Sequence, residues 1–361
     1  PVLYLVIAHF SASVISFSIS AGVNPIEELV SLFINVPDMW SAIIGAFLMI
    51  AVVVTSLTFA RRRMSYEAWY IVHVMSYIAV LAAVPHQFSS GSDIHGKPVQ
   101  TIFWVSLYFF VLFNLVWYRV LAPMIRGWKL GLRVAAVRPE SSDSVSIYLE
   151  GKNVGKLGGQ AGQFYMLRVM TATAWWRPHP FSISAAPNDR FVRFTIGKRG
   201  DDTAALQHIK PGTKVLLEGP YGVFTEDRRI KEKVVLVASG IGIPPIRALA
   251  ESLTAKPGHV TVIYRVRNKD DAALLDEVRE LCSLRGYKLE VMDGPRANNS
   301  SWMNADGTNR PERVRLAEIA PAIVDSDVYI CGPTGWTHAV EKCALRAGVP
   351  AHQVHAEEFA W

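Results

Sequence analysis

Four long apolar segments near the start of the chain constrain its fold more than any other feature. They lie before residue 123 of the 361 residues, at residues 2–20, 40–60, 68–88 and 99–122. Each has about the length that an α-helix needs to cross the hydrocarbon core of a bilayer. Because a long hydrophilic part follows them, we predict a multidomain membrane protein with a helical transmembrane bundle over residues 1–122.

Basic residues beside these segments predict the orientation of the bundle. Lys and Arg concentrate on the cytoplasmic side of membrane proteins. Here they follow the second segment at Arg61, Arg62 and Arg63, and they stand at the end of the fourth segment or after it at Arg119, Arg126, Lys129 and Arg133. We therefore expect a multi-pass protein of the plasma membrane whose C-terminal part is cytoplasmic. The pI of 9.2 reflects these residues, and no basic stripe with interleaved aromatic residues indicates a nucleic-acid partner.

Three histidines stand in the apolar segments, where an imidazole costs free energy unless something binds it. His9 lies in the first segment, while His73 and His86 share the third, 13 residues apart. That spacing is roughly 20 Å along a helix and suits two stacked cofactors, and imidazole is a common axial ligand of haem iron. Hydrogen-bonded packing and a proton relay are the alternatives. On a regular helix the two side chains would point in directions roughly 140° apart about the helix axis. Binding of both histidines to stacked haems therefore needs a local irregularity in the helix, for which Pro85 is the candidate.

Two haems with histidine on both sides of each iron need four imidazoles, whereas these segments hold three. The chain also starts at Pro1 and enters apolar sequence at once, without the basic region of a signal peptide. We therefore expect further spans upstream of Pro1, which carry the fourth ligand.

The sequence changes its pattern from about residue 132. Short β-branched runs separated by Gly, Pro and Asp predict a small antiparallel barrel over residues 132–226. The stretch VVLVASGIGIPPIRALAESL at residues 234–253 then predicts a buried strand, a glycine turn and a helix, and another strand follows. This β-α-β pattern is typical of nucleotide binding. Cys282 and Cys343 fall on predicted helices without metal-ligand spacing, so we expect them in the core.

An ordered set of motifs resembles the ferric reductase and NADPH oxidase superfamily over essentially the whole chain. The set comprises the intramembrane histidines, RPHPFSIS at residues 177–184, GIGIPP at 240–245, CGP at 331–333 and a C-terminal aromatic residue. The resemblance implies an antiparallel β-barrel FAD domain over residues 123–228 and an α/β Rossmann-like NADP domain over residues 229–361. It also implies that His9 and His86 bind the outer of two b-type haems and that His73 binds the inner one.

The resemblance places the flavin on the HPFS sequence. It implies FAD contacts for His179, Pro180, Phe181 and Ser182, because an extended strand presents rings for packing and a hydroxyl for hydrogen bonding. A glycine turn before a predicted helix is a second candidate, since N–H groups at a helix start favour phosphate oxygens. Its residues, which are candidates for the FAD pyrophosphate or form a capped surface turn, are Lys198, Arg199, Gly200 and Thr203.

The nicotinamide nucleotide is expected at the glycine turns of the second domain. Gly240 and Gly242 let the backbone approach a dinucleotide phosphate, and Pro244 stands where the family usually has Thr. Arg265 and Arg267 follow the next strand, where arginine suits the 2′-phosphate of NADPH; solvated surface charge is the alternative. The resemblance implies that the turn beside the nicotinamide ring is formed by Cys331, Gly332 and Pro333.

The last residues of the chain also match the family. The resemblance implies that Trp361, with Phe359, covers the flavin and moves aside for hydride transfer, while Glu358 helps to hold this end of the chain. An aromatic residue packed on the domain surface is the alternative.

The function implied by the resemblance is electron transfer across a membrane. NADPH gives a hydride to FAD, and single electrons pass through the inner and outer haems to an acceptor. Dioxygen reduced to superoxide is the favoured acceptor. The alternatives are a ferric chelate and a partner protein or quinone.

Overall fold

The computed structural model describes residues 2–57, 66–91, 94–171, 174–175, 177–298, 300–305, 307 and 310–359. Contacts divide the chain into two compact units, which we call the helical unit (Pro1–Val116) and the C-terminal unit (Trp117–Trp361). The predicted boundary at residue 123 therefore lies within the C-terminal unit. The basic cluster Arg61, Arg62 and Arg63 lies outside the described residues, as does Trp361.

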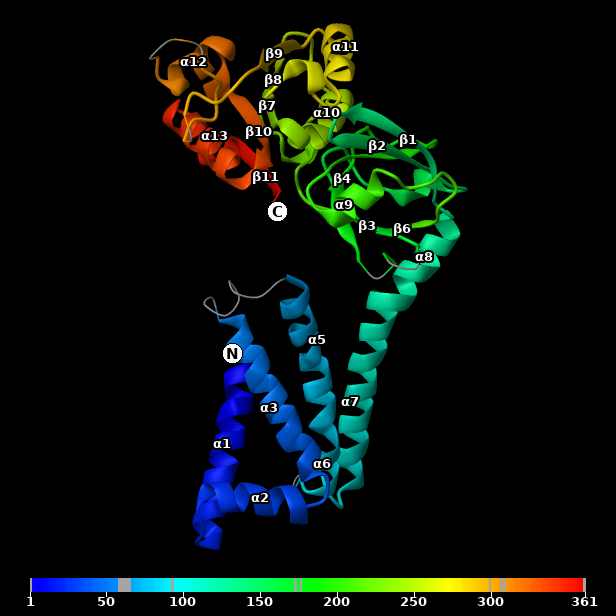
Figure 1. Cartoon of the computed structure of the whole chain (residues 1–361), viewed down its shortest axis with the longest axis vertical. Helices are drawn as coiled ribbons and strands as arrows, with labels where there is room; N and C mark the ends of the chain where they lie inside the picture. The colour runs from blue at the N-terminus through cyan, green and yellow to red at the C-terminus, as the bar shows by residue number, and fades with distance from the viewer. Residues whose placement is uncertain are drawn as a thin grey trace. The chain divides into compact units, whose positions relative to one another are not determined.

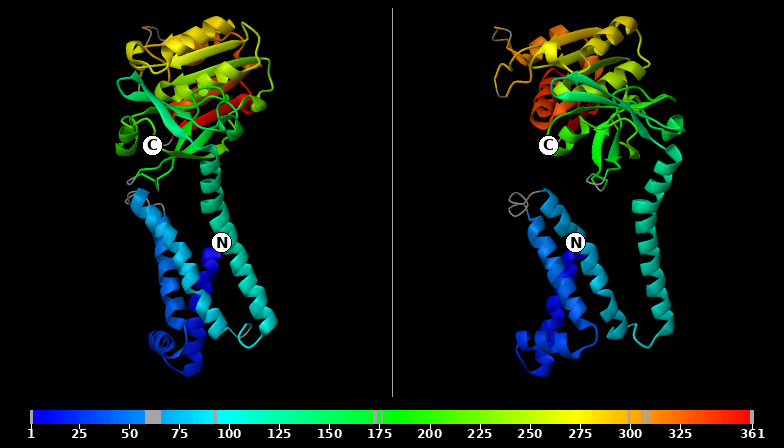
Figure 2. Two further views of the ribbon diagram at one scale, coloured as in Figure 1. Left: turned by 90° about the vertical axis from the view of Figure 1, so that its right-hand side faces the viewer. Right: turned by 45° about the vertical axis from the view of Figure 1, so that its right-hand side comes forward.

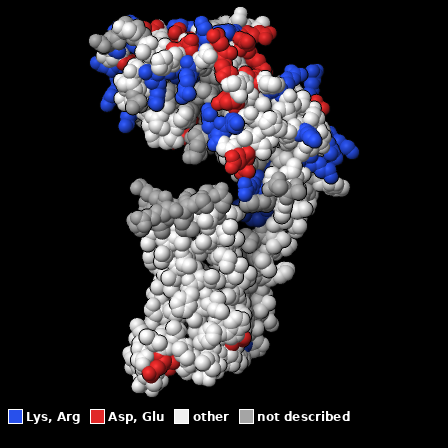
Figure 3. Space-filling model, in the orientation of Figure 1, with Lys and Arg blue, Asp and Glu red and all other residues white. Residues whose placement is uncertain are grey.

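The helical unit contains helices at each predicted segment (Figure 1). Their bounds are α1 Val2–Ala21, α2 Pro25–Asn35, α3 Met39–Ser56, α5 Tyr66–Ala82, α6 Val84–Ser89 and α7 Pro98–Val116. Among the described residues of the whole chain, four helical stretches are long and apolar enough to cross a membrane, and the fourth, Pro98–Leu130, runs on into the C-terminal unit. Figure 3 shows few charged side chains on this unit in the face drawn, in contrast to the C-terminal unit. Helix α2 was not predicted, although Asn24 caps it and Pro25 opens it.

Helices α1, α3 and α5 lie side by side (Figure 2). A small residue permits the approach of α3 to α5, because a Cβ atom at Gly45 would lie 2.7 Å from the carbonyl oxygen of Ala79. The predicted irregularity before His86 is present. Helix α5 ends at Ala82, the amide of Ala83 is shared between two carbonyls at 3.3 and 3.1 Å, and Pro85 lies in the first turn of α6.

The C-terminal unit begins with a π-helical turn, Trp117–Leu121, and helix α8, Ala122–Leu130. Arg126 on α8 donates to the carbonyl oxygens of Gly219 at 2.6 Å and Leu157 at 2.7 Å. A Cβ atom at Gly127 would lie 2.2 Å from Leu216 Cδ2. Helix α8 is therefore a docked part of the unit that follows it.

Two three-stranded antiparallel sheets form the first half of this unit, in the orders β1-β2-β5 and β4-β3-β6. The strands are β1 Arg133–Ser141, β2 Ser144–Glu150, β3 Phe164–Val169, β4 His179–Ser182, β5 Val192–Gly197 and β6 Val215–Tyr221. Single bridges, Ile183 to Phe194 and Arg133 to Lys214, connect the sheets at both edges. Antiparallel pairing is as predicted, but the described strands form two bridged sheets and not one continuous barrel ladder.

A five-stranded parallel sheet forms the second half, in the order β11-β10-β7-β8-β9. The strands are β7 Lys233–Ser239, β8 Val260–Arg265, β9 Lys288–Met292, β10 Ser326–Pro333 and β11 Val354–Phe359. Helices α10 Ile243–Ser252 and α11 Leu275–Arg285 belong to one core cluster, and α12 Glu312–Ile319 and α13 Thr334–Arg346 to the other. The strand order reverses between β7 and β10, which is where open α/β sheets bind ligands.

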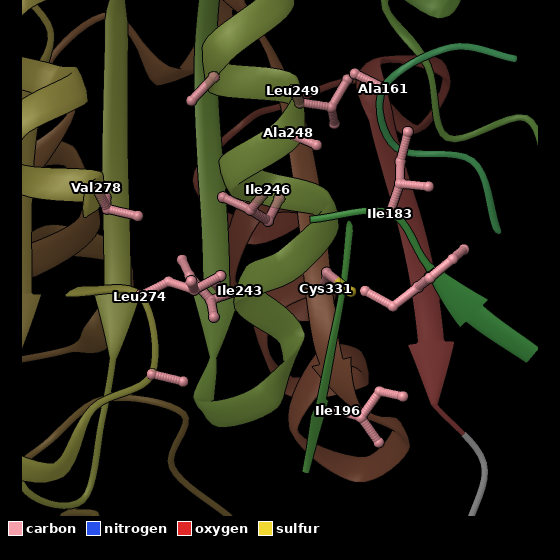
Figure 4. Packing of buried hydrophobic residues seen from close by; sticks show 14 of the residues in the cluster. Ala161, Ile183, Ile196, Ile243, Ile246, Ala248, Leu249, Leu274, Val278 and Cys331 are labelled. Atoms are coloured by element: carbon pink, nitrogen blue, oxygen red, sulfur yellow. The ribbon is translucent and has the colours of Figure 1, made fainter. Parts of the chain in front are cut away.

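The two halves share a continuous apolar core. Ile183 and Ile196 come from the antiparallel half, and Ile243, Ile246 and Leu249 come from α10, as Figure 4 shows. Cys282 and Cys343 are buried as predicted, and burial raises the pKa of each thiol to about 11.

A buried ionic network also crosses between the halves. Arg193 on β5 donates to Ser184 Oγ at 3.0 Å, to the Ser184 carbonyl oxygen at 2.6 Å and to Glu277 Oε1 at 2.7 Å. Glu277 on α11 also pairs with Arg247 at 3.1 Å, and Arg247 pairs with Glu251. Burial alone would raise the pKa of Glu277, but the two guanidinium groups hold it below its ordinary value.

We predict that Glu277→Gln destabilises the C-terminal unit, because it leaves the Arg193 charge buried without its carboxylate. Removing one partner of a buried pair costs about 3–5 kcal/mol, and since Glu277 is about a third exposed we expect about 2 kcal/mol. Thermal unfolding of the full chain should show a midpoint lower by about 4–8 °C. The matched control is Asp276→Asn, whose exposed pair with Arg279 should contribute less than about 0.5 kcal/mol.

The same pair makes stability depend on pH in a defined direction. Because the folded pKa of Glu277 is lowered, its contribution is present above the ordinary value of 4.5 and is lost as the pH falls below it. In Glu277→Gln, stability should therefore fall less on acidification than it does in the wild type, because the titrating carboxylate is absent. Equal midpoints for the wild type and both variants would show that the network carries no stability.

Candidate active site

Two turns meet at the switch point of the parallel sheet. The first, Gly240–Gly242, follows β7, and the second ends β10 at Cys331, Gly332 and Pro333. A Cβ atom at Gly242 would lie 2.2 Å from the Cys331 carbonyl oxygen and 2.7 Å from its carbon. Gly240 has φ of +51° and open space around it. The lack of a side chain at Gly242 therefore allows the backbone of the first turn to pack against the Cys331 backbone. Gly240 instead has a positive φ, a backbone conformation that favours glycine.

A pocket joins the HPFS strand to the first turn. It is lined by Pro180, Phe181, Ser182, Thr195, Ile196, Gly197, Ile241 and Pro244. Ser182 is 4% exposed, and its Oγ has no hydrogen-bond partner within the described part of the chain. A buried hydroxyl without a partner is costly, and the polar edge of a flavin would satisfy it. The residues present therefore fit FAD at this pocket, with Phe181 available for ring packing.

His179 begins the HPFS strand and faces an acidic partner. Its Nε2 lies 3.6 Å from Asp202, which also accepts a hydrogen bond from Arg177 at 3.0 Å. Burial lowers the pKa of His179, and the opposing pull of Asp202 does not overcome it. These surroundings favour the neutral imidazole, which offers one donor and one acceptor nitrogen.

The turn before helix α9, Asp201–Leu206, is closed by its own hydrogen bonds. Thr203 Oγ1 accepts from the Arg199 amide at 2.8 Å and donates to the Gly200 carbonyl at 3.0 Å, while the Arg199 side chain pairs with Asp143 at 3.2 Å. Asp201 and Asp202 already place negative charge in the first helical turn. This arrangement favours the capped surface turn, and the pyrophosphate role of Lys198, Arg199, Gly200 and Thr203 stays a prediction.

Arg265 is buried at the end of β8, and its predicted 2′-phosphate contact stays a prediction. The side chain is 5% exposed and donates to the carbonyl oxygens of Val266, Met292 and Gly294. Burial and the nearby charge of Arg296 lower its pKa. Since these carbonyls occupy the guanidinium, Arg265 holds the ends of β8 and β9 together. Arg267 is exposed and is the more accessible candidate of the pair.

Arg296 is a further basic residue at this edge. It is exposed, follows β9, and lies close enough to Arg265 to affect its pKa. Sequence reasoning missed Arg296 because nothing in the stretch GPRANN marks it as a neighbour of β8; only strand order brings the two together.

Strand β11 lies beside the turn Cys331–Pro333. Strand β11 pairs with β10 so that Glu358 is opposite Gly332 and Phe359 is opposite Pro333. Glu358 forms an ion pair with His338 on α13 at 2.9 Å. The Phe359 side chain lies outside the described part of the chain, as Trp361 does, so their predicted flavin contact stays a prediction. Cys331 is fully buried, which raises the pKa of its thiol well above the ordinary value.

The surroundings of the intramembrane histidines fit a role as ligands of haem iron. The Nδ1 atom of His86 is buried without a hydrogen-bond partner among the described residues, and His9 is close enough to interact with it electrostatically. The Nδ1 atom of His73 lies 3.4 Å from Ser56 Oγ, and its ring stacks on Trp69 at 4.6 Å. A partner on one imidazole nitrogen orients the other for metal binding. The donor set therefore fits haem.

Three family models match successive parts of the chain. A ferric reductase-like transmembrane component matches residues 2–84, an FAD-binding domain matches residues 130–225, and an oxidoreductase NAD-binding domain matches residues 236–342. Their order is the predicted order of the domains.

Curated relatives and solved structures agree with the FAD-binding and NAD-binding family matches of the C-terminal part. Flavohemoproteins of Chromobacterium violaceum and Vibrio cholerae are 28% and 27% identical over 64% and 74% of this chain, which spans 61% and 70% of their lengths. The FAD/NAD-binding domain of nitric oxide dioxygenase from Vibrio cholerae superposes with a TM-score of 0.52 at 23% identity, covering 64% of this chain and 99% of that one. The ferredoxin reductase in carbazole 1,9a-dioxygenase superposes with a TM-score of 0.52 at 23% identity, covering 64% of this chain and 69% of that one. These structures show a shared FAD/NAD reductase fold.

We predict that Gly242→Ala slows flavin reduction by NADPH, because the added methyl group displaces the Cys331–Pro333 turn. A shift of about 1 Å in a positioned group costs roughly 100-fold in rate, which stopped-flow absorbance of the flavin would measure. The matched control is Gly335→Ala, where a Cβ atom meets nothing within 4 Å. Bound flavin should be unchanged in both variants. An unaltered rate in Gly242→Ala would contradict the proposed packing of the two turns.

Proposed function

We propose an electron pathway for this chain, which is a membrane NAD(P)H-dependent oxidoreductase with the domain architecture of the ferric reductase and NADPH oxidase superfamily. Electrons from cytosolic NADPH pass through FAD and two b-type haems to an acceptor on the outer face of the plasma membrane. When bound, FAD takes up a hydride and releases electrons singly, and haem carries single electrons onward. The spans cross the membrane several times, and the C-terminal unit is cytoplasmic.

The observation that carries this proposal is the partnerless Nδ1 atom of His86, in the same chain as a flavin pocket. In an apolar span this nitrogen has no water to satisfy it. Coordination of this imidazole to iron would remove that cost, and the proximity of His9 supports it as the second imidazole for the same iron. His73 then belongs to the inner haem, with its Nε2 as the ligand and Nδ1 on Ser56.

In the C-terminal unit, each proposed contact has a defined task. Ser182 Oγ hydrogen-bonds the flavin and Phe181 packs on it. The Gly242 and Cys331 backbones hold the nicotinamide turn against the flavin pocket. Arg267, with Arg296 as an added candidate, binds the 2′-phosphate and favours NADPH over NADH. Trp361 and Phe359 cover the flavin until the nicotinamide displaces them.

Dioxygen reduced to superoxide is our proposed outcome at the outer haem. A ferric chelate, or a partner protein or quinone, is the second candidate, on the same electron path. Relatives named flavohemoproteins support the combination of flavin and haem, and the acceptor is decided by experiment.

The haem assignment predicts a pattern among histidine variants of the intact polypeptide. His9→Leu and His86→Leu should each remove roughly half of the b-type bands in a dithionite-reduced minus oxidised spectrum, because they share one of two irons. The double variant should lose no more than either single variant. His73→Leu combined with His86→Leu should lose nearly all.

His95→Leu is the matched control for this series. His95 lies between α6 and α7, with Nδ1 3.2 Å from the Phe88 carbonyl oxygen. Its substitution should leave the spectrum intact, and flavin content should stay constant throughout as a measure of folding. Full b-type bands in both His9→Leu and His86→Leu would refute the assignment.

The acceptor is tested with purified full-length protein and NADPH. We expect dye reduction that superoxide dismutase abolishes and that stops without oxygen. NADH at the same concentration should support a lower rate. Faster turnover on adding a ferric chelate under anaerobic conditions, with no dismutase-sensitive signal in air, would replace dioxygen by iron as the acceptor.

A further inference from the structure

A cluster of potential metal ligands lies on the outer side of helix α13. His338 and Glu341 stand on α13, and Glu358 stands on β11. One ligand atom from each of the three lies within 4.8 Å of the other two, and His338 Nε2 is 2.9 Å from Glu358 Oε1. His338 and Glu341 have no role in the proposed electron pathway. Glu358 has only its predicted role of helping to hold the end of the chain.

The fold brings these three residues together for definite reasons. Positions i and i+3 of a helix share a face, which places His338 and Glu341 side by side. Helix α13 starts at Thr334, directly after the nicotinamide turn, and packs against β11. The parallel pairing of β11 with β10 sets Glu358 opposite Gly332. Glu358 therefore reaches the first turns of α13.

The charges of the cluster are those of a cation site. It has two carboxylates and one imidazole, and among the residues that the structure describes neither carboxylate pairs with a Lys or Arg. A histidine and a carboxylate alone would form an ordinary surface pair. The second carboxylate adds like charge at close range, and a divalent cation would relieve that repulsion.

We propose that His338, Glu341 and Glu358 bind one divalent transition-metal cation of the Zn²⁺ class. Imidazole nitrogen and carboxylate oxygen are both Zn²⁺ ligands, and three protein ligands leave a position for water. The cation joins α13 to β11 next to the nicotinamide turn. On the proposed function, this link restrains the end of the chain that must move for hydride transfer, so the bound cation slows NADPH oxidation.

Calorimetric titration of the purified full chain with Zn²⁺ alone tests the site. We expect one binding event that Glu341→Gln and His338→Gln each weaken at least about tenfold, since each removes a ligand. Glu358→Gln should do the same. The matched control is His259→Gln, because His259 also pairs with a carboxylate, Glu232 at 3.9 Å, but belongs to no cluster of three ligands among the described residues. It should bind as the wild type does.

Two results would overturn the proposal: no Zn²⁺ binding at up to about 100-fold excess, or binding that the three substitutions leave unchanged. Unfolding midpoints without metal should match the wild type in His338→Gln and Glu341→Gln, so that weak binding is not a folding defect. A midpoint raised by Zn²⁺ in the wild type and not in these variants supports the same site.

The effect on turnover is read separately. Zn²⁺ should slow flavin reduction by NADPH in the wild type and in His259→Gln, and it should leave the rate of Glu341→Gln unchanged. If the protein oxidised no NADPH at all, the proposed function would fail, while the titration would still decide the cation site.

Discussion

The buried guanidinium of Arg193 is the constraint on which the geometry of the C-terminal unit depends. A charge that is 4% exposed is tolerated only with partners on all sides, and its partners come from three places in the sequence. Ser184 follows the HPFS strand, Tyr148 lies on β2, and Glu277 lies on α11, where it also pairs with Arg247 of α10. The strand that offers Ser182 to a flavin is thus fixed to the helix that follows the first glycine turn. An enzyme that moves a hydride between two bound nucleotides needs this kind of fixed spacing.

The helical unit is governed by a different rule, because hydrocarbon offers no hydrogen bonds. Ser56 Oγ lies within hydrogen-bonding distance of one nitrogen of His73, and a new helical segment, α6, begins before His86. Pro85 is the local cause, because it lacks an amide hydrogen and so interrupts the ladder that would otherwise run through α5 and α6. An irregular helix at a position with a partnerless imidazole is more consistent with a ligand than with simple packing.

Features set by local sequence were predictable, and features set by distant residues were not. The length and apolar character of the segments predicted α1, α3, α5 and α7. The glycine turn after an apolar strand predicted the position of the switch point. Helix α2 could have been found from Asn24 and Pro25, whose capping signal was overlooked. The hydrogen bonds of Arg265 could not be predicted, because sequence shows the charge but not the carbonyls of Met292 and Gly294, which lie at and after the end of β9. Arg193 gave no signal, since its partner Glu277 lies 84 residues away.

Helix α8 is held on the antiparallel sheets of the C-terminal unit. The π-helical turn Trp117–Leu121 shifts the helical phase just before α8, and extra residues in a helical turn rotate the faces that follow. After this shift, Arg126, Gly127 and Leu130 face the antiparallel sheets, while Trp128 remains 83% exposed. The two bonds from Arg126 to Gly219 and Leu157 leave α8 little freedom to turn on the sheets. The direction of α8 on the sheets is therefore fixed by the same residues that bury its inner face.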